Sequence, residues 1–173
     1  VAYNNTGADV SRTLAVTVGG SSVSAPLSVA SGQTAVVVTG LNAQVKNFVT
    51  LTGDFGFQKT TAADPADDEL LVVSSNAAAK LKVGTAVEAG VSGATLALLV
   101  RGDGTLALQA SGTAALSLGN GFASATASSV AVAYNNTGAD VSRTLAVTVG
   151  GSSVSAPLSV ASGQTAVVVT GLN

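Results

Sequence analysis

Residues 1–42 read VAYNNTGADVSRTLAVTVGGSSVSAPLSVASGQTAVVVTGLN, and the same 42 letters return without a change at residues 132–173. The two copies are offset by 131 residues, the distance from Val1 to Val132. The chain therefore divides into one full period, residues 1–131, followed by the start of the next identical period. A repeat at a fixed period predicts units that pack against their neighbours. The meaning of this chain is expected to lie in the repetition.

The repeated stretch alternates apolar and polar residues in steps of two, the pattern of a β-strand with one buried face. Thr13–Val18 shows this alternation, a Gly-Gly pair then supplies a hairpin turn, and the alternation continues through Val29. A further glycine turn leads into the apolar run at Thr34–Thr39. The stretch therefore predicts a three-stranded antiparallel meander.

The rest of the period continues in the same way, and no segment has the 3.6-residue spacing of an amphipathic helix. About ten or eleven strands separated by turns predict an all-β fold. We expect antiparallel short-strand meanders that form a β-sandwich or rolled sheet, stacked as a tandem-repeat rod. One predicted strand runs through Val132, the start of the second copy, so neighbouring periods are expected to share a sheet. The further predicted strands are Val45–Thr52, Asp54–Gln58, Glu69–Ser74, Ala78–Val83, Ala94–Val100, Thr105–Ala110, Thr113–Leu118, Phe122–Ser128 and Val130–Asn135.

The composition favours close packing of sheets. Apolar residues make up 47% of the chain, aromatic residues 3% and charged residues only 9%, while His, Cys, Met and Trp are absent. Small and β-branched residues allow sheets to approach closely, and low charge removes a usual defence against edge-to-edge association. The net charge of −2 argues against a nucleic-acid partner, because no basic patch is present to neutralise phosphates. The chain also has no apolar run long enough for a membrane-spanning helix.

Catalysis is not expected, because without His or Cys the chain has no Ser-His-Asp triad, thiol nucleophile or imidazole metal site. The one acidic cluster is the candidate metal site. Asp64, Asp67, Asp68 and Glu69 supply carboxylate oxygens, the ligands that calcium prefers. Their spacing matches neither an EF-hand loop nor a calcium-binding β-roll. The alternative interpretation, a solvated loop that adds solubility, is favoured, and no other cofactor is expected.

Two short motifs have both a functional and a structural interpretation. Arg101-Gly102-Asp103 spells a tripeptide that integrins bind, but Asp-Gly before a new strand is typical of a hairpin turn. Asn4 and its copy Asn135 each begin a formal N-glycosylation sequon. The structural interpretation, a polar turn, is favoured for both.

The segments LTGDFGFQK (51–59), AKLKVG (79–84) and GATLALLVRGDGTLALQASGTAALSL (93–118) resemble the repeat units of giant bacterial secreted and surface proteins. The VAYNNTGADVSRTLAVTVGG stretch is similar to the part of those repeats that follows the Ala- and Ser-rich strands. The resemblance implies an exported, adhesin-like or filament-like array and brings no active site with it.

Two functional hypotheses follow. The first is a structural repeat of an extracellular bacterial filament, sheath or matrix fibre, without catalytic activity, whose partners are neighbouring repeats or copies of the same chain. The second is the stalk or weak-binding repeat of a calcium-stiffened surface adhesin. A third arrangement, in which the second copy in one chain completes the sheet of another, keeps the first function and changes only the covalent connection. All three place the protein outside the cell or at its surface.

Overall fold

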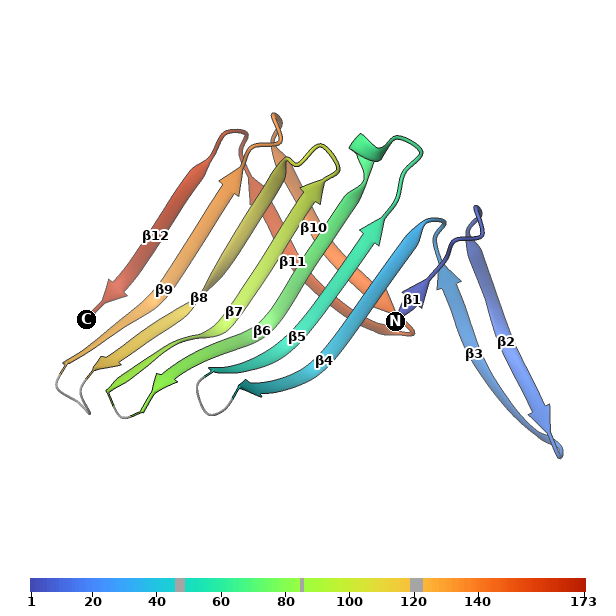
Figure 1. The fold of residues 1–173 in the computed structure, drawn as a ribbon, viewed down its shortest axis with the longest axis horizontal. Coiled ribbons are helices and arrows are strands. Elements are labelled where there is room, and N and C mark those ends of the chain that lie inside the picture. Colours follow the sequence, from blue (N-terminus) through green and yellow to red (C-terminus); the bar gives the residue numbers. More distant parts are fainter. Residues whose placement is uncertain (46–48, 85, 119–122) are drawn as a thin grey trace.

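The computed structural model describes the whole chain except residues 46–48, 85 and 119–122, so that Phe48 and Phe122, predicted strand residues, lie outside the described part. The fold is all-β and antiparallel, as predicted, with one eight-stranded sheet and two separate two-stranded hairpins (Figure 1). The strand order in the large sheet is β1-β4-β5-β6-β7-β8-β9-β12. The strands are β1 (Ala2–Tyr3), β2 (Val10–Val18), β3 (Ser21–Val29), β4 (Gln33–Val45), β5 (Val49–Thr60), β6 (Glu69–Val83), β7 (Val87–Arg101), β8 (Leu106–Leu118), β9 (Ala123–Asn135), β10 (Val141–Val149), β11 (Ser152–Val160) and β12 (Thr165–Leu172), and a 3-10 turn, η1, spans Pro65–Asp67.

The repeated stretch forms a two-stranded hairpin and not the predicted three-stranded meander. Strands β2 and β3 pair with each other, as do β10 and β11, and the Gly-Gly turn was predicted correctly. Strand β4, however, pairs with β1 and β5. The chain reverses after β3 with a hydrogen bond from Gln33 N to Ala30 O (3.2 Å), and Gly32 there has a φ of +68°. The meander in this fold is therefore β4–β9, and the hairpin is a separate layer.

Several pairs of predicted strands are each one long strand with a bulge at the predicted break. The break predicted between Ser74 and Ala78 falls inside β6, where the register with β7 shifts near Asn76, a residue with φ of +49°. Similar shifts occur beside Gly53 in β5 and Gly93 in β7, which also have positive φ. Such residues serve equally in turns and in β-bulges, which bend a strand without ending it. The pattern alone therefore could not distinguish the two.

The core lies between the upper half of the large sheet and one hairpin. Figure 1 shows β10–β11 crossing the sheet from β9 back toward β4, and the hairpin contacts β4 to β8. From the sheet, Ala35, Val73, Ala97, Leu99 and Ala107 point into this layer and are almost completely buried. Three of these five residues are alanines, and their small side chains let the hairpin approach the sheet closely.

Gly56 in β5 lies where β10 crosses the sheet, and a larger residue is expected to destabilise the fold there. A Cβ at Gly56 would stand 2.8 Å from Val147 Cβ and 2.9 Å from Val73 Cγ2. Gly56→Ala is therefore expected to lower the free energy of unfolding by about 1–3 kcal/mol, measured by urea denaturation, because overpacking forces side chains off their rotamers. In a double-mutant cycle, Val147→Ala is expected to relieve part of this loss. Strictly additive effects would contradict the contact.

Candidate functional site

The two identical hairpins have opposite surroundings. Hairpin β10–β11 buries its apolar face against the sheet, whereas the same face of β2–β3 is exposed. The exposed fractions of the matched pairs are 1% for Leu145 against 45% for Leu14, 0% for Val147 against 64% for Val16, and 2% for Val154 against 75% for Val23. Identical residues thus give one covered and one uncovered surface, so the candidate functional surface of this chain is the uncovered hairpin.

A buried asparagine builds the corner from which each hairpin leaves the sheet. Asn135 donates from Nδ2 to the carbonyl oxygens of Ala139 and Val160, both at 2.9 Å, and its Oδ1 accepts from the backbone N and the hydroxyl of Thr137. Asn4 makes the same four bonds in the first copy. Since the amide nitrogen is buried and bonded twice, the sequon residues act as turn residues in this fold.

Polar contacts join the second hairpin to the sheet. Arg143 in β10 donates from one guanidinium nitrogen to both carboxylate oxygens of Glu69, at 3.0 and 3.1 Å. The backbone N of Ser159 donates to Gln109 Oε1 at 2.7 Å. At the corner, Leu106 N donates to Asn136 Oδ1 at 2.6 Å, and Asn136 N donates to Leu106 O at 3.1 Å.

The matching groups of the first copy have no such bonds among the described residues. The counterparts are Arg12, the backbone N of Ser28 and Asn5, and all three residues are exposed. The two hairpins therefore differ in polar contacts as well as in apolar burial.

The large sheet continues through the start of the second copy, as predicted. Val132 lies inside β9 and pairs with Ala110 of β8 on one side and Val167 of β12 on the other. Both ends of the sheet also have the same pairing, with a shift of 131 residues. Ala2↔Ala35 and Tyr3↔Thr34 join β1 to β4, and Ala133↔Ala166 and Tyr134↔Thr165 join β9 to β12. Strand β1 thus occupies the place of the end of β9, and β12 the place of β4.

The acidic residues predicted as calcium ligands lie in and beside η1, and three of them contact protein groups. Asp64 accepts from Ala66 N (2.9 Å) and caps η1, and Asp68 accepts from Ala62 N (2.9 Å). Glu69 binds Arg143. Within the described ranges, no three His, Cys, Asp or Glu residues are grouped so that they could hold a metal ion. The calcium site, which also included Asp67, stays a prediction.

The Arg-Gly-Asp tripeptide forms the turn between β7 and β8. Asp103 Oδ1 accepts from the backbone N and the hydroxyl of Thr105, at 2.8 and 2.7 Å. Gly102 packs against η1 and donates from its N to Asp68 O at 2.8 Å, so the turn is held against the acidic loop. Its carboxylate is engaged within the turn, as the structural interpretation expects.

Thr105→Val is expected to raise the pKa of Asp103 toward its ordinary value of 3.8. The Thr105 hydroxyl is the largest cause of the lowered pKa, because its hydrogen bond stabilises the ionised carboxylate. A lowered folded pKa means stabilisation that is present above pH 3.8 and is lost as the pH falls through the folded value. An NMR titration of the Asp103 carboxyl carbon measures the shift. Thr95→Val, which removes a hydroxyl bonded to Ser111, should leave this pKa unchanged.

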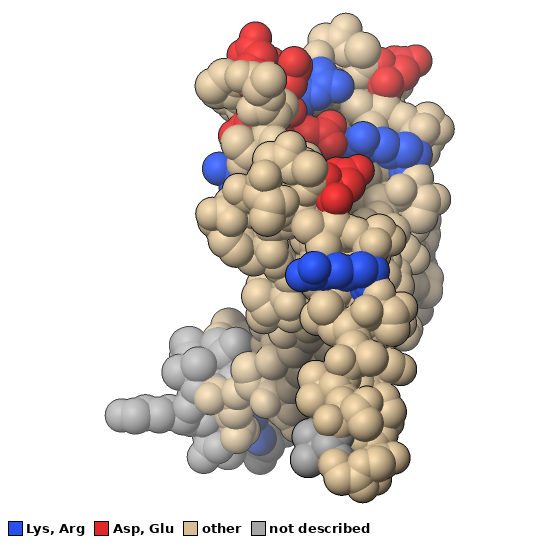
Figure 2. Space-filling view, turned by 90° about the vertical axis from the view of Figure 1, so that its right-hand side faces the viewer, with Lys and Arg blue, Asp and Glu red and all other residues tan. Residues whose placement is uncertain are grey.

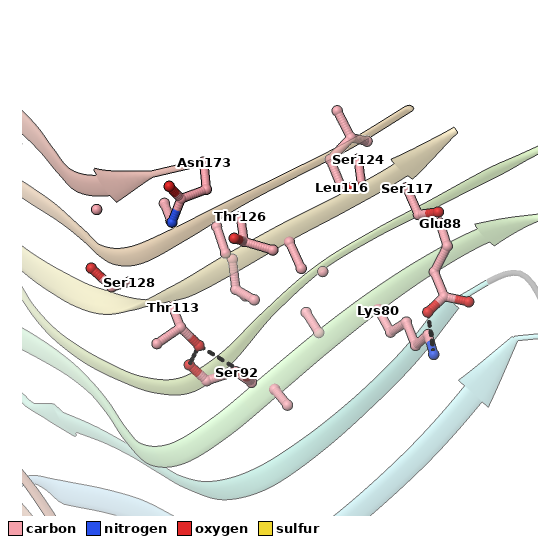
Figure 3. Close-up of a pocket in the computed structure, with 18 residues that line it drawn as sticks. Lys80, Glu88, Ser92, Thr113, Leu116, Ser117, Ser124, Thr126, Ser128 and Asn173 are labelled. Atoms are coloured by element: carbon pink, nitrogen blue, oxygen red, sulfur yellow. Dashed lines mark hydrogen bonds and ion pairs between the residues drawn. The ribbon is translucent and has the colours of Figure 1, made fainter. Parts of the chain in front are cut away.

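A shallow groove of about 640 Å³ lies on the lower halves of β6–β9 (Figure 3). Its lining is mostly Ala, Gly, Ser and Thr. The polar groups in it are paired with each other, Lys80 with Glu88 at 2.6 Å and the hydroxyls of Ser92 and Thr113 at 2.7 Å. The hydrogen bond from Lys80 lowers the pKa of Glu88, which disfavours a role as general acid.

Charged side chains gather at one end of the molecule. Figure 2 shows them mainly in the upper part of the view, whereas the lower part of that face is mostly uncharged. The upper end carries the acidic loop and its ion pairs Lys59–Asp68 and Arg143–Glu69, at 3.7 and 3.0 Å. The rest of this face presents small uncharged side chains.

In the part of the chain that the structure describes, no helix has the length and apolarity needed to cross a membrane. The functional argument therefore depends on the paired hairpins and on the ends of the sheet. No protein-family model, curated protein or solved structure matches the chain.

Proposed function

We propose that this chain is a structural repeat of an extracellular bacterial filament, sheath or matrix fibre, with no catalytic activity. The observation that carries the proposal is the match between the two ends of the sheet, where β1·β4 and β9·β12 have the same register one period apart. A sheet whose two ends are related by the sequence period can be extended by adding periods. Repetition would then build a continuous rod of stacked units.

Open sheet edges support this interpretation. Strand β12 has β9 on one side only, and β4 is paired beyond β5 only through the two residues of β1. An uncovered edge exposes backbone N–H and C=O groups, which in other proteins favours pairing with a further strand. In an array, each of these edges is paired by the neighbouring period, so the liability becomes the means of assembly.

The chemistry of the chain agrees with an exported structural role. Charged residues are few and cysteine is absent, and small side chains dominate the sheet faces outside the core. The sequence also resembles the repeats of giant bacterial surface proteins. The alternative, a calcium-stiffened adhesin stalk, requires the acidic loop to bind calcium.

Arrays of two, four and eight periods, each ending in residues 132–173, test the proposal. Strands β4–β9 give six strands per period, which at about 4.8 Å each predicts about 29 Å of sheet per added period. Cryo-electron microscopy and small-angle X-ray scattering, with and without a calcium chelator, should show stiff rods that lengthen in proportion to the number of periods. Flexible beads would refute the proposal, and rods that stiffen only with calcium would support the adhesin stalk in its place.

A further inference from the structure

We infer that the exposed face of hairpin β2–β3 docks on the sheet of a further copy of this period, placed before Val1 as residues 43–131 are placed before Val132. The inference rests on the proposed function and names the partner of this surface. We call the surface the N-terminal hairpin face, and its residues are Leu14, Val16, Val23 and Ala25, all exposed.

The second copy of the same hairpin shows what covers this face. The four equivalent residues, Leu145, Val147, Val154 and Ala156, are at most 2% exposed. They pack in one cluster with residues of the large sheet, among them Val73, Ala97 and Leu99. The sequences are identical, so the N-terminal hairpin face fits the same arrangement of small and branched side chains. A further copy of the sheet provides that arrangement.

The polar groups around the face match the same partner. Arg12 is the counterpart of Arg143, and it would meet Glu69 of the added copy. Likewise, Ser28 N would meet Gln109, and Asn5 would exchange hydrogen bonds with the backbone of Leu106. The bonds that these assignments copy are observed at the second hairpin, at 2.6 to 3.1 Å. The partner is thus specified by charge and hydrogen bonding as well as by shape.

The direction of the two hairpins agrees with this placement. In Figure 1, β10–β11 runs from the β9 end back across the sheet toward β4. Hairpin β2–β3 leaves the sheet beside β1 and extends in the same general direction, away from β4. A sheet that precedes β1 would therefore lie where β2–β3 extends. Strand β1 already marks the place of its last strand.

A separate molecule of this chain is a poorer partner. Its sheet is already covered by its own β10–β11, whose sequence is identical to that of β2–β3. Exchange of one hairpin for the other replaces contacts by the same contacts, while association costs translational and rotational freedom. The occupant we assign is therefore the preceding period in a tandem array.

The test compares the full chain with an extended chain in which an additional copy of residues 43–131 precedes Val1. Amide hydrogen exchange is measured for β2–β3 in both. We expect the amides of β2–β3 to exchange at least about 100-fold more slowly in the extended chain, because docking removes local opening. Leu14→Asp should abolish this protection in the extended chain, while β10–β11 in the same molecule stays protected and reports that the rest of the chain is folded.

A charge-reversal pair tests the assigned contact. Arg12→Glu should reduce the protection of β2–β3, and Glu69→Arg in the added copy should restore part of it. Equally fast exchange in both chains would overturn the inference. So would concentration-dependent oligomers of the original chain that Leu14→Asp abolishes, because the partner would then be a separate molecule. The stiffness of long arrays is measured independently, so a rod with an undocked hairpin would refute this inference and leave the proposed function intact.

Discussion

Leu145→Ala is expected to lower the free energy of unfolding by about 2–5 kcal/mol, whereas Leu14→Ala should lower it by less than about 1 kcal/mol. Both substitutions remove the same atoms from the same local sequence. Leu145 is buried among the sheet residues, so its loss removes apolar burial and leaves a cavity, while Leu14 is already largely in water. Urea denaturation of the two variants measures the difference.

This pair separates tertiary packing from local sequence effects. Strand propensity, hairpin pairing and turn chemistry are the same at both positions, because Leu14↔Ala25 and Leu145↔Ala156 are the same cross-strand pair. Any difference therefore comes from what lies across the hairpin face. Equal losses would show that β2–β3 is covered in solution or that β10–β11 is not, and either result would contradict the arrangement described above.

Asn135→Ala is expected to lower the free energy of unfolding by about 2–4 kcal/mol. The substitution removes both donors to the carbonyl oxygens of Ala139 and Val160 and the acceptor of Thr137 N. A buried backbone group left without a partner costs about 1–3 kcal/mol, and the bond to Val160 is fully buried. The corner would then hold β10–β11 less firmly on the sheet. Thermal and urea unfolding measure the loss.

Asn4→Ala is the matched control for the corner. It removes the same bonds, and Asn4 is also buried. Hairpin β2–β3 has no sheet under its apolar face, and an isolated two-stranded hairpin is only marginally stable in water. We therefore expect faster amide exchange confined to residues near Asn4, with a much smaller change in global unfolding. A global loss as large as that of Asn135→Ala would mean that β2–β3 is part of the cooperative core.

Local sequence signals predicted the local structure of this chain well. The Gly-Gly pair marks the hairpin turn, the Asp-Gly pair marks the turn after β7, and the alternation of apolar residues identifies the strands. The strand through Val132 was also predicted, because the alternation does not stop at the repeat boundary. These features depend on neighbouring residues alone, so the sequence contains all that is needed to find them.

Three features of the fold lay outside the reach of pattern. The positive-φ residues Gly53, Asn76 and Gly93 were interpreted as strand ends and are bulges, since the same backbone conformation suits both. The departure of β4 from the hairpin into the large sheet depends on pairing with β5, which follows later in the chain. The contacts of the acidic residues with Lys59 and Arg143 depend on how distant segments meet.

The repeated segment shows most directly what each level decides. The sequence by itself determined that residues 10–29 and their copy form a hairpin with one apolar face, because alternation and turn chemistry are local properties. Only the tertiary structure decided that one copy is buried and the other exposed. An apolar face is stabilised by whatever surface covers it, and here that surface is a sheet that precedes the second copy in the chain but not the first. Identical residues therefore belong to the core in one place and form a docking surface in the other.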